Sequence, residues 1–395
     1  MKLSSMVTLL LALAAASSAH AAEESELRIQ SVECRGNHST SCEFIRSHLN
    51  LSAGMPLSEV ELRNAQLRLS SLRNFEAVEV RLEKGTRRNA VIVAIEVTEA
   101  SPITTESLVG LSSRLDATRS VIAGRVAHQN LFGTGKTIDL AAVAATPLAG
   151  EPYDEQYEVH LRYADPNLFG SDSYFAVARA SWINASRRDI YGNFSDFEGA
   201  EIDLRVGRRF GDFSYITLSA TFRPDPDWVT GEWDFGGPTN FDITVRDRQH
   251  GYNIIYGWNS EDDLYFPTQG RSFHIGAGWD FGTGSPANRS HVQFRQTWQL
   301  DNSLLTVKLG GSPSPEYRTS FDDSQLFSIS YARSLQASDD VKRGRWYIEP
   351  GVSTAGYTDQ NDRIYEVGIK AGVRLDTRTF GIVDLYLIAT RDPQR

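Results

Sequence analysis

Residues 128–140 read HQNLFGTGKTIDL, and the way this stretch folds decides the class of the whole protein. It contains Gly135-Lys136-Thr137, which is how a phosphate-binding loop ends. Such a loop also needs a glycine five positions before Gly135, where backbone amides wrap the phosphates, and Asn130 stands there instead. The stretch is therefore either an altered nucleotide site or a tight glycine turn between two strands, and the surrounding sequence must decide.

The first 21 residues form a unit of their own. Lys2 gives it a positive start, residues 6–16 are almost wholly apolar, and Ala19-His20-Ala21 has the form of a signal-peptide cleavage site. About 11 apolar residues fall short of the ~20 that a membrane-spanning helix requires. We therefore expect a secretory signal at residues 1–21 and an exported mature chain.

The chain has two cysteines, Cys34 and Cys42. Export places them in an oxidising compartment, so a disulfide that closes this short loop is the favoured prediction. Two reduced, buried thiols are the alternative. A zinc site is less favoured, because the nearby His38 and His48 do not make a recognised ligand spacing.

The composition narrows the function classes. A formal net charge of −10 argues against a nucleic-acid-binding protein, which would usually show a basic stripe. After the signal no run of 18 apolar residues occurs, which excludes a helical membrane protein. A membrane β-barrel is not excluded, because its strands alternate apolar and polar residues and so contain no long apolar run.

Residues 25–101 predict a small α+β domain of the order βααββ. Three stretches alternate apolar and polar residues as strands do, and they lie at residues 27–32, 78–82 and 91–97. Two helices fall between the first and second strands, each opened by a capping box, Thr40-x-x-Glu43 and Ser58-x-x-Glu61. A three-stranded sheet of this kind leaves an edge open, which can accept an extended peptide as a further strand.

From residue 102 to residue 395 the chain alternates with a period of two. In Glu201–Arg208, Ile202, Leu204 and Val206 face one way and charged residues the other. A soluble β-sandwich would also alternate. The segments favour a membrane barrel, because about 10 residues span a bilayer at a tilt whereas strands of soluble sheets usually have ~5 to 6. Aromatic residues near segment ends are typical of interfacial girdles, and these are Trp182, Tyr191, Trp228, Trp258, Tyr265, Trp279, Trp298 and Trp346.

About 15 candidate strands follow from this pattern. They lie near residues 108–115, 120–131, 137–146, 155–164, 173–184, 199–210, 213–223, 250–260, 271–282, 290–301, 303–311, 324–335, 345–357, 363–376 and 380–390. Single-chain bacterial barrels usually have an even number of strands. We therefore expect about 16 strands, or one fewer if the last strand is absent. A missed or wrongly split strand would also explain the odd count.

Four ordered motifs carry a family resemblance. They are NLFGTG at residues 130–135, YADPNLFGSDSYF at 163–175, NSEDDLYFPTQGRSFHIG at 259–276, and Tyr347-x-Glu349-x-Gly351. In this order, after a signal and a βααββ unit, they resemble the outer-membrane protein assembly-factor superfamily of BamA- and TamA-like bacterial surface antigen barrels. Residues 25–101 resemble a single POTRA domain of that superfamily, with GN after the first strand and LRNFEAVEV leading into the second.

The resemblance implies a fold, a location and a function. The fold is a mainly β, transmembrane antiparallel barrel at residues 102–395 in the bacterial outer membrane, preceded by a periplasmic POTRA domain. The function is to insert or translocate other polypeptides into or across that membrane without a cofactor. The partners are outer-membrane lipid, unfolded client or partner polypeptides and periplasmic accessory proteins, but no nucleic acid. The matching motif residues are Asn130, Phe132, Gly133, Gly135, Pro166, Phe169, Gly170, Pro267, Gly270, Glu349 and Gly351.

The chain also departs from the family. Family members carry an inward loop with an Arg-Gly-aromatic motif, whose arginine pairs with late-strand acids. Here LGGS at 309–312 leads into PSPEYRTSFDDS, where Arg318 is the one basic residue, and Arg343-Gly344-Arg345 lies in a later expected turn without the aromatic. Glu349 would then need water or another cation as its partner. The chain ends LYLIATRDPQR rather than with an aromatic closing strand.

Two functions of different classes remain. The first is the assembly or translocation factor, and the second is a passive outer-membrane channel or structural barrel that has lost the transport role. An enzyme is not expected, since no Ser-His-Asp order, GxSxG elbow or metal cluster occurs in the sequence. His128, His160 and His274 fall on expected strands as polar lumen or turn residues. In this context NLFGTGKT is a glycine turn between two strands, and it requires no phosphate.

Overall fold

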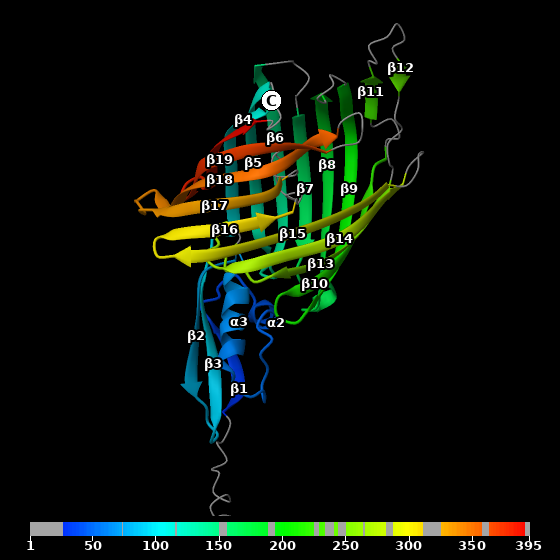
Figure 1. The fold of residues 1–395 in the computed structure, drawn as a ribbon. Coiled ribbons are helices and arrows are strands. Elements are labelled where there is room, and N and C mark those ends of the chain that lie inside the picture. Colours follow the sequence, from blue (N-terminus) through cyan, green and yellow to red (C-terminus); the bar gives the residue numbers. More distant parts are fainter. Residues whose placement is uncertain are drawn as a thin grey trace, which may run out of the picture.

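The computed structural model describes residues 27–72, 74–114, 117–149, 156–188, 194–224, 229–233, 241–243, 250–263, 265–281, 287–310, 325–357 and 363–391. The signal expected at residues 1–21 lies outside these ranges. The described chain forms a small α+β unit and a closed β-barrel, and the small unit lies against one end of the barrel (Figure 1). The predicted fold class, mainly β with a small N-terminal α+β region, is confirmed.

The small unit has the predicted order of elements. These are β1 (Arg28–Arg35), α2 (Cys42–Ser47), α3 (Glu59–Ser70), β2 (Phe75–Lys84) and β3 (Ala90–Glu99). Its sheet has the order β1-β3-β2, with β1 parallel and β2 antiparallel to β3. Apolar side chains from both helices and the sheet form one buried core, in which Ile45, Leu69 and Ile95 have no exposed surface. Burial of these side chains stabilises the unit by roughly 1.5–3 kcal/mol for each large one.

The two edges of this sheet differ. Beside β1, the segment around Met55 adds backbone hydrogen bonds, from the Ile29 amide to Met55 O (2.9 Å) and from the Leu57 amide to Leu27 O (2.8 Å). β2 pairs with β3 on one side, and no strand among the described residues pairs with its other side. β2 is therefore the open edge of the sheet.

Both helices begin at a capping serine, and one of the two predicted caps was at a different residue. α3 begins as predicted, because the Glu61 amide donates to Ser58 Oγ (3.4 Å). The predicted cap of the first helix at Thr40 is wrong. α2 is capped by Ser41, whose Oγ accepts a hydrogen bond from the Phe44 amide (3.1 Å). The Thr40 hydroxyl instead bonds to a side chain of the barrel.

Fifteen strands close the barrel wall. They are β4 (Ile103–Arg114), β5 (Ala117–Leu131), β6 (Lys136–Ala149), β7 (Gln156–Asp165), β8 (Tyr174–Arg188), β9 (Phe194–Phe210), β10 (Ser214–Phe222), β13 (His250–Asn259), β14 (Gly270–Phe281), β15 (Ala287–Leu300), β16 (Ser303–Leu309), β17 (Gln325–Leu335), β18 (Val341–Tyr357), β19 (Arg363–Thr377) and β20 (Gly381–Arg391). Two short strands, β11 (Val229–Trp233) and β12 (Phe241–Ile243), pair with each other at the end away from the small unit (Figure 1). Each strand predicted from the alternation corresponds to one strand of the wall.

The odd number of strands has a topological consequence. Each strand of the wall runs opposite to the one before it, so the first and the last run the same way. β20 accordingly pairs with β4 in parallel, from Ile382–Glu106 to Ala389–Ser113. The predicted antiparallel barrel is thus antiparallel everywhere except at this β4–β20 seam, and it has the smaller of the two expected strand numbers.

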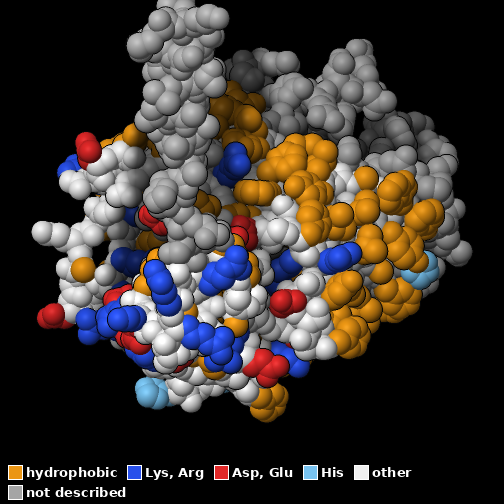
Figure 2. Space-filling model, turned by 90° about the horizontal axis from the view of Figure 1, so that it is seen from below, with side chains coloured by type: hydrophobic (Ala, Val, Ile, Leu, Met, Phe, Trp, Pro, Cys, Tyr) orange, Lys and Arg blue, Asp and Glu red, His pale blue; other side chains and the backbone are white. Residues whose placement is uncertain are grey.

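The two faces of the wall have opposite chemistry. Along β9, Ile202, Leu204 and Val206 are exposed on the outside, while Glu201 and Asp203 are buried inside. Seen from the small-unit end, hydrophobic side chains gather over the barrel wall, and charged side chains gather over the small unit (Figure 2). The buried acidic residues of β9 thus face inward, as the alternation in the sequence predicted. No helix among the described residues is long and apolar enough to cross a membrane.

Candidate functional site

Two turns at the small-unit end of the barrel carry the same tetrapeptide, Asn-Leu-Phe-Gly. One is Asn130–Gly133, which begins at the end of β5 and leads toward β6, and the other is Asn167–Gly170 between β7 and β8, where η2 (Leu168–Gly170) lies. In both turns the phenylalanine has a left-handed backbone, with a φ of 58° at Phe132 and at Phe169. The two rings are 91% and 94% exposed. A bulky residue rarely adopts this conformation, so each turn holds its aromatic ring outside the protein on a strained backbone.

The first of these turns binds the start of α2. Asn130 Nδ2 donates to Thr40 Oγ1 (2.9 Å), and Asn130 Oδ1 accepts the Gly135 amide (2.9 Å). The Ser41 amide donates to Gly133 O (2.9 Å). The asparagine that stands where a phosphate-binding loop has its first glycine therefore fixes the turn and joins it to the small unit.

The contact is too close for side chains at the two glycines. A Cβ on Gly133 would lie 2.3 Å from Ser39 O, and a Cβ on Gly135 would lie 2.2 Å from the ring of Phe44. Both glycines also have a φ of 71°, which favours glycine. The two glycines of NLFGTG thus allow the backbone of the turn and also the close contact with the segment that begins α2.

The second turn binds the other end of α2. Asn167 Nδ2 donates to Ser47 Oγ (2.8 Å), and the Asn167 amide donates to Asp165 Oδ1 (3.0 Å). Pro166 O accepts a hydrogen bond from Arg209 Nη1 (2.8 Å), which ties this turn to β9. The two NLFG turns therefore hold α2 at both of its ends.

A third turn, Gly211–Phe213 between β9 and β10, binds α3. Asp212 accepts hydrogen bonds from Arg68 Nη1 and from Asn64 Nδ2, the latter at 2.7 Å. Arg68 also donates through Nε to His48 O (2.8 Å). Burial lowers the pKa of Arg68, and the charge of Asp212 opposes that effect. This ion pair between the small unit and the barrel is less exposed than the pair that Lys342 makes with Glu76.

His48 is half-buried, and its ring centre lies 4.5 Å from that of Phe44 in the core of the small unit. Its Nδ1 lies 2.9 Å from Phe44 O, to which it donates, and its Nε2 has no hydrogen-bond partner among the described residues. Burial, with the positive charges of Arg209 and Arg68, lowers the pKa of His48 to about 4. The side chain is therefore neutral near pH 7.

A disulfide joins Cys34 to Cys42, with their Cα atoms 5.7 Å apart. It links the end of β1 to the first residue of α2. Glu99 adds a second link, because its carboxylate accepts the amides of Ser39 and Thr40. The loop that meets the first NLFG turn is thus constrained by a covalent bond and a carboxylate.

Residues 260–263 and 265–269, which form the turn between β13 and β14, fold into the barrel. Asp262 accepts the Thr268 amide (2.9 Å), and Asp263 Oδ1 accepts the amides of Tyr265 (2.8 Å) and Phe266 (2.9 Å). Gly270 ends the turn with a φ of 111°. These acceptors give the turn a fixed shape, which we call the inward turn.

Tyr265 of the inward turn reaches both sides of the seam from within. Its hydroxyl bonds to Glu106 on β4 and lies 3.3 Å from Arg125 Nη1 on β5. Its backbone oxygen accepts hydrogen bonds from Arg345 on β18 and from Arg374 Nη1 on β19, the latter at 3.1 Å. The prediction that Tyr265 belongs to an outer aromatic girdle is therefore wrong, because its hydrogen bonds to charged side chains of the inner wall hold it inside the barrel.

The rest of the inward turn is held by arginines. Phe266 is buried, with the guanidinium carbons of Arg343 and Arg345 at 4.5 and 4.8 Å from its ring centre. Pro267 O accepts from Arg345 Nη1 (3.3 Å). Arg343 and Arg345 lie on β18 and not in the turn expected for them. The sequence pattern missed this, because positive charges next to a strand resemble a solvated turn.

Glu349 on β18 has a cationic partner inside the lumen. Both of its oxygens accept from Lys308 Nζ on β16 (2.8 and 3.0 Å), and Ser328 Oγ donates to it at 2.7 Å. Gly351 lies on the same strand, opposite Ser328. Arg318, the basic residue of the altered loop, lies outside the described residues. Lys308 is thus the cation that the sequence left unassigned.

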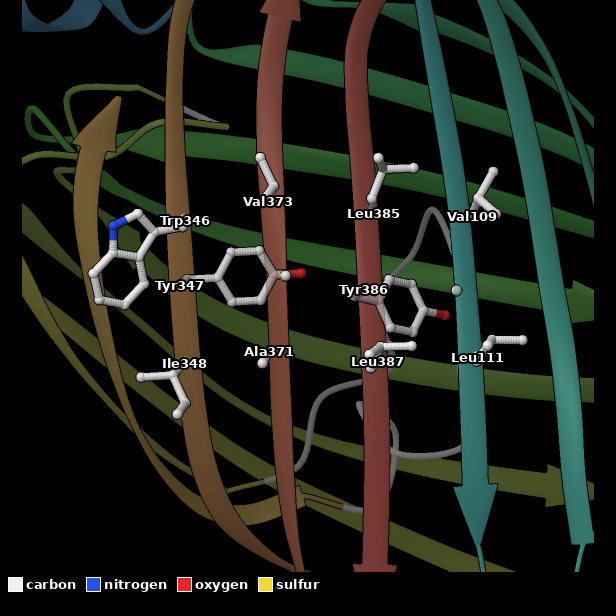
Figure 3. A pocket seen from close by; sticks show the side chains of 12 residues that line it. Val109, Leu111, Trp346, Tyr347, Ile348, Ala371, Val373, Leu385, Tyr386 and Leu387 are labelled. Carbon is white, nitrogen blue, oxygen red and sulfur yellow. The ribbon is translucent and has the colours of Figure 1, made fainter. Parts of the chain in front are cut away.

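Tyrosine and glycine alternate in register across the seam. Tyr347 of β18, Gly372 of β19, Tyr386 of β20 and Gly110 of β4 form one row. The ring of Tyr347 reaches over β19 and the ring of Tyr386 reaches toward β4 (Figure 3). A Cβ on Gly110 would lie 2.3 Å from Tyr386 Cζ. The residues that precede and follow these four on each strand are apolar. Together with the tyrosine and glycine row they line a groove of about 550 Å³.

A Ser-His-Glu trio lies on the inner wall. His160 Nδ1 lies 2.8 Å from Ser181 Oγ, and His160 Nε2 lies 2.8 Å from Glu158 Oε2. Ser181 and Glu158 are both buried. His160 and Ser181 face each other in a paired ladder of β7 and β8, where the backbone amides are engaged with the neighbouring strand. We interpret the trio as a polar contact of the wall. Among the described residues no group of His, Cys, Asp and Glu has the arrangement of a metal site.

Similar structures give the fold a context. No protein-family model matches the sequence, and no curated protein sequence matches it. CdiB from Escherichia coli has a TM-score of 0.57 at 12% sequence identity, over 89% of this chain and 70% of that chain. CdiB from Acinetobacter baumannii has a TM-score of 0.54 at 12% identity, over 89% of this chain and 68% of that chain. BamA from Haemophilus ducreyi lacking POTRA domains 1–3 has a TM-score of 0.40 at 12% identity, over 93% and 81%. The CdiB structures share the fold of this chain, so the resemblance drawn from the motifs is confirmed at the level of the fold.

Proposed function

We propose that this protein resides in the bacterial outer membrane and helps insert or translocate other polypeptides, with the small unit in the periplasm. The combination that supports this is a closed barrel with an apolar outside and a charged inside, to which a βααββ unit with one open sheet edge is docked. Its fold is shared with CdiB from two organisms. Lipid covers the outer wall in this proposal, and extended client or partner chains are its cargo.

The open edge of β2 is the proposed client site. An exposed edge offers unpaired backbone amides and carbonyls to an extended chain, which binds as a further strand. The other edge is already occupied by the segment around Met55. Charged side chains on β2, such as Glu79 and Arg81, disfavour pairing of this edge with the same edge of another copy of the protein.

Side chains that fill the lumen make a wide passive channel less favoured. Charged groups from several strands are buried against one another inside it, including Glu106 with Arg125 (2.8 Å) and Glu349 with Lys308. The inward turn adds Tyr265 and Phe266 to this filling. The passive channel remains the second candidate, because the sequence lacks the Arg-Gly-aromatic triplet of the family. We also propose that the protein works without cofactor, metal or covalent catalysis.

Depletion in the native cell, with crosslinking at the open edge, tests the proposal. A photo-crosslinking residue in place of Glu79 on β2 should capture unfolded polypeptides, and the same residue in place of Gln30 on β1 should not. Depletion should lower the amount of other outer-membrane barrels or of secreted proteins. Normal amounts of both, together with a steady ion conductance in planar bilayers, would support the passive channel instead.

A further inference from the structure

The two NLFG turns have a feature that the contacts within the chain leave unexplained. Phe132 and Phe169 hold a left-handed backbone, which costs a bulky residue free energy that glycine or asparagine would not incur. Both rings are almost fully exposed, so burial within the chain does not offset that cost. The same strain at equivalent positions of two turns points to a contact outside the chain.

The barrel wall next to these turns carries further exposed aromatic residues. On the ends of β7, β8 and β9 nearest these turns, Tyr163, Tyr174 and Phe210 face outward and are exposed. Arg208 lies beside them with its guanidinium carbon 5.7 Å from the ring centre of Tyr174. Outward aromatic rings with a cation among them are typical of the level where a barrel wall meets lipid headgroups.

We propose that Phe132 and Phe169 insert into the periplasmic leaflet of the outer membrane, and that this lipid contact holds the two turns in the shape that docks α2. The inference rests on the proposed location in the outer membrane. Lipid occupies the ring side of each turn, and α2 occupies the asparagine side, through Asn130–Thr40 and Asn167–Ser47. The bilayer thereby stabilises the docked small unit without touching it.

Lipid fits these rings better than a protein partner does. The two phenylalanines are on separate turns of adjacent hairpins, and the same hairpins expose the apolar side chains of Val126, Leu140 and Leu161. A bilayer covers such a surface continuously and needs no matching pocket. A periplasmic protein partner is the outcome that the following experiment separates from lipid.

The first test measures lipid contact with the full-length protein in phosphatidylethanolamine–phosphatidylglycerol vesicles. A cysteine replaces Phe132 or Phe169, carries a bimane label, and is exposed to lipids with a nitroxide near the headgroup. We expect strong quenching at both positions and none at the control Val60→Cys, an exposed apolar position on α3 of the small unit. Quenching no stronger than at Val60 would overturn the proposal, and it is the result expected for a protein partner.

A further position separates this proposal from the proposed function. Leu204→Cys on the outside of β9, exposed to lipids with a nitroxide on the acyl chain, should be quenched if the barrel spans the bilayer at all. Quenching at Leu204 without quenching at Phe132 and Phe169 would reject the anchoring and retain the membrane barrel. Quenching at none of the three would reject the membrane location itself.

The second test measures the coupling to α2. The double variant Phe132→Ala/Phe169→Ala removes both rings and keeps a Cβ, so the cost of the left-handed backbone remains and the lipid contact that offsets it is lost. We expect hydrogen exchange in α2 and the loop before it to become about tenfold faster in vesicles. The control Phe380→Ala removes an exposed ring from the β19–β20 turn, whose Arg378 amide bonds to Asp340, and should leave α2 unchanged. Equal exchange in the double variant and the wild type would contradict the coupling.

Discussion

At the scale of single residues, His48 makes the docking of the small unit sensitive to acid. Its pKa in the folded protein is about 4, below the ordinary value of 6.5, so between these values the unfolded state binds more protons. The stability that the neutral side chain provides is complete above pH 6.5 and is lost as the pH falls toward 4. At 1.36 kcal/mol for each pKa unit, the loss is on the order of 3 kcal/mol. Hydrogen exchange of residues 42–72, measured from pH 7 to pH 4.5, should show it.

The matched variant for this prediction is His48→Asn, which keeps a donor for Phe44 O and cannot take up a proton. Glu99, whose pKa hydrogen bonds from Ser39 and Thr40 lower, is present in both proteins. The difference between the two pH profiles therefore belongs to His48. Parallel profiles for the wild type and His48→Asn would show that His48 has no part in the acid sensitivity.

At the scale of elements, the parallel seam depends on the fit of Tyr386 over Gly110. Gly110→Val adds a Cβ 2.3 Å from Tyr386 Cζ, so the ring or the strand must move. Overpacking of this kind typically costs about 1–3 kcal/mol. The unfolding temperature of the barrel, read from its shift in gel mobility after heating, should fall by several degrees. Adding Tyr386→Ala should remove the clash and recover part of that loss relative to Gly110→Val.

Gly124 on β5 provides the control for the seam. The nearest atom to a Cβ at that position is Glu106 O, at 4.0 Å, so Gly124→Val meets open space. The variant should change the unfolding temperature little. A similar fall for both glycine variants would mean that the added side chain itself, rather than the contact with Tyr386, weakens the wall.

The strands were predictable because their signal is local, and the seam was not. Alternation of apolar and polar residues marks each strand, and the pattern placed all fifteen in the wall. Which strand meets which at the closure depends on the whole chain, so β4–β20 pairing has no local sequence signal. The same limit explains Tyr265. An aromatic residue at a strand end reads as a girdle residue, and only the arginines of β5, β18 and β19 reveal that it faces inward.

At the scale of the whole molecule, the docking turns were recognised as turns but not as docking sites. The spacing of NLFGTG predicted a glycine turn correctly, yet the role of Asn130 depends on Thr40, ninety positions away. Thr40 was predicted to cap α2, and a sequence alone does not show that the neighbouring Ser41 takes that place. Lys308 and Glu349 are a further case, since their pairing across β16, β17 and β18 follows from barrel register.

The link between small unit and barrel should reside mainly in one ion pair. Arg68 and Asp212 have 13% and 35% of their side-chain surface exposed, whereas Lys342 and Glu76 have 46% and 48%. A hydrogen bond to a charged, desolvated group contributes roughly 1.5–3 kcal/mol, and an exposed ion pair about 0–1 kcal/mol. A double-mutant cycle of Arg68→Met and Asp212→Ala should therefore give a coupling energy of about 1–3 kcal/mol.

The cycle is read from hydrogen exchange of α3 in the full-length protein, and Lys342→Met with Glu76→Ala supplies the comparison cycle. Arg68→Met alone should cost less than Asp212→Ala alone, because the latter leaves a largely buried guanidinium without its carboxylate. Equal coupling in the two cycles would place the docking energy outside the Arg68–Asp212 pair. The NLFG turns and their contacts with α2 would then be the main attachment of the small unit to the barrel.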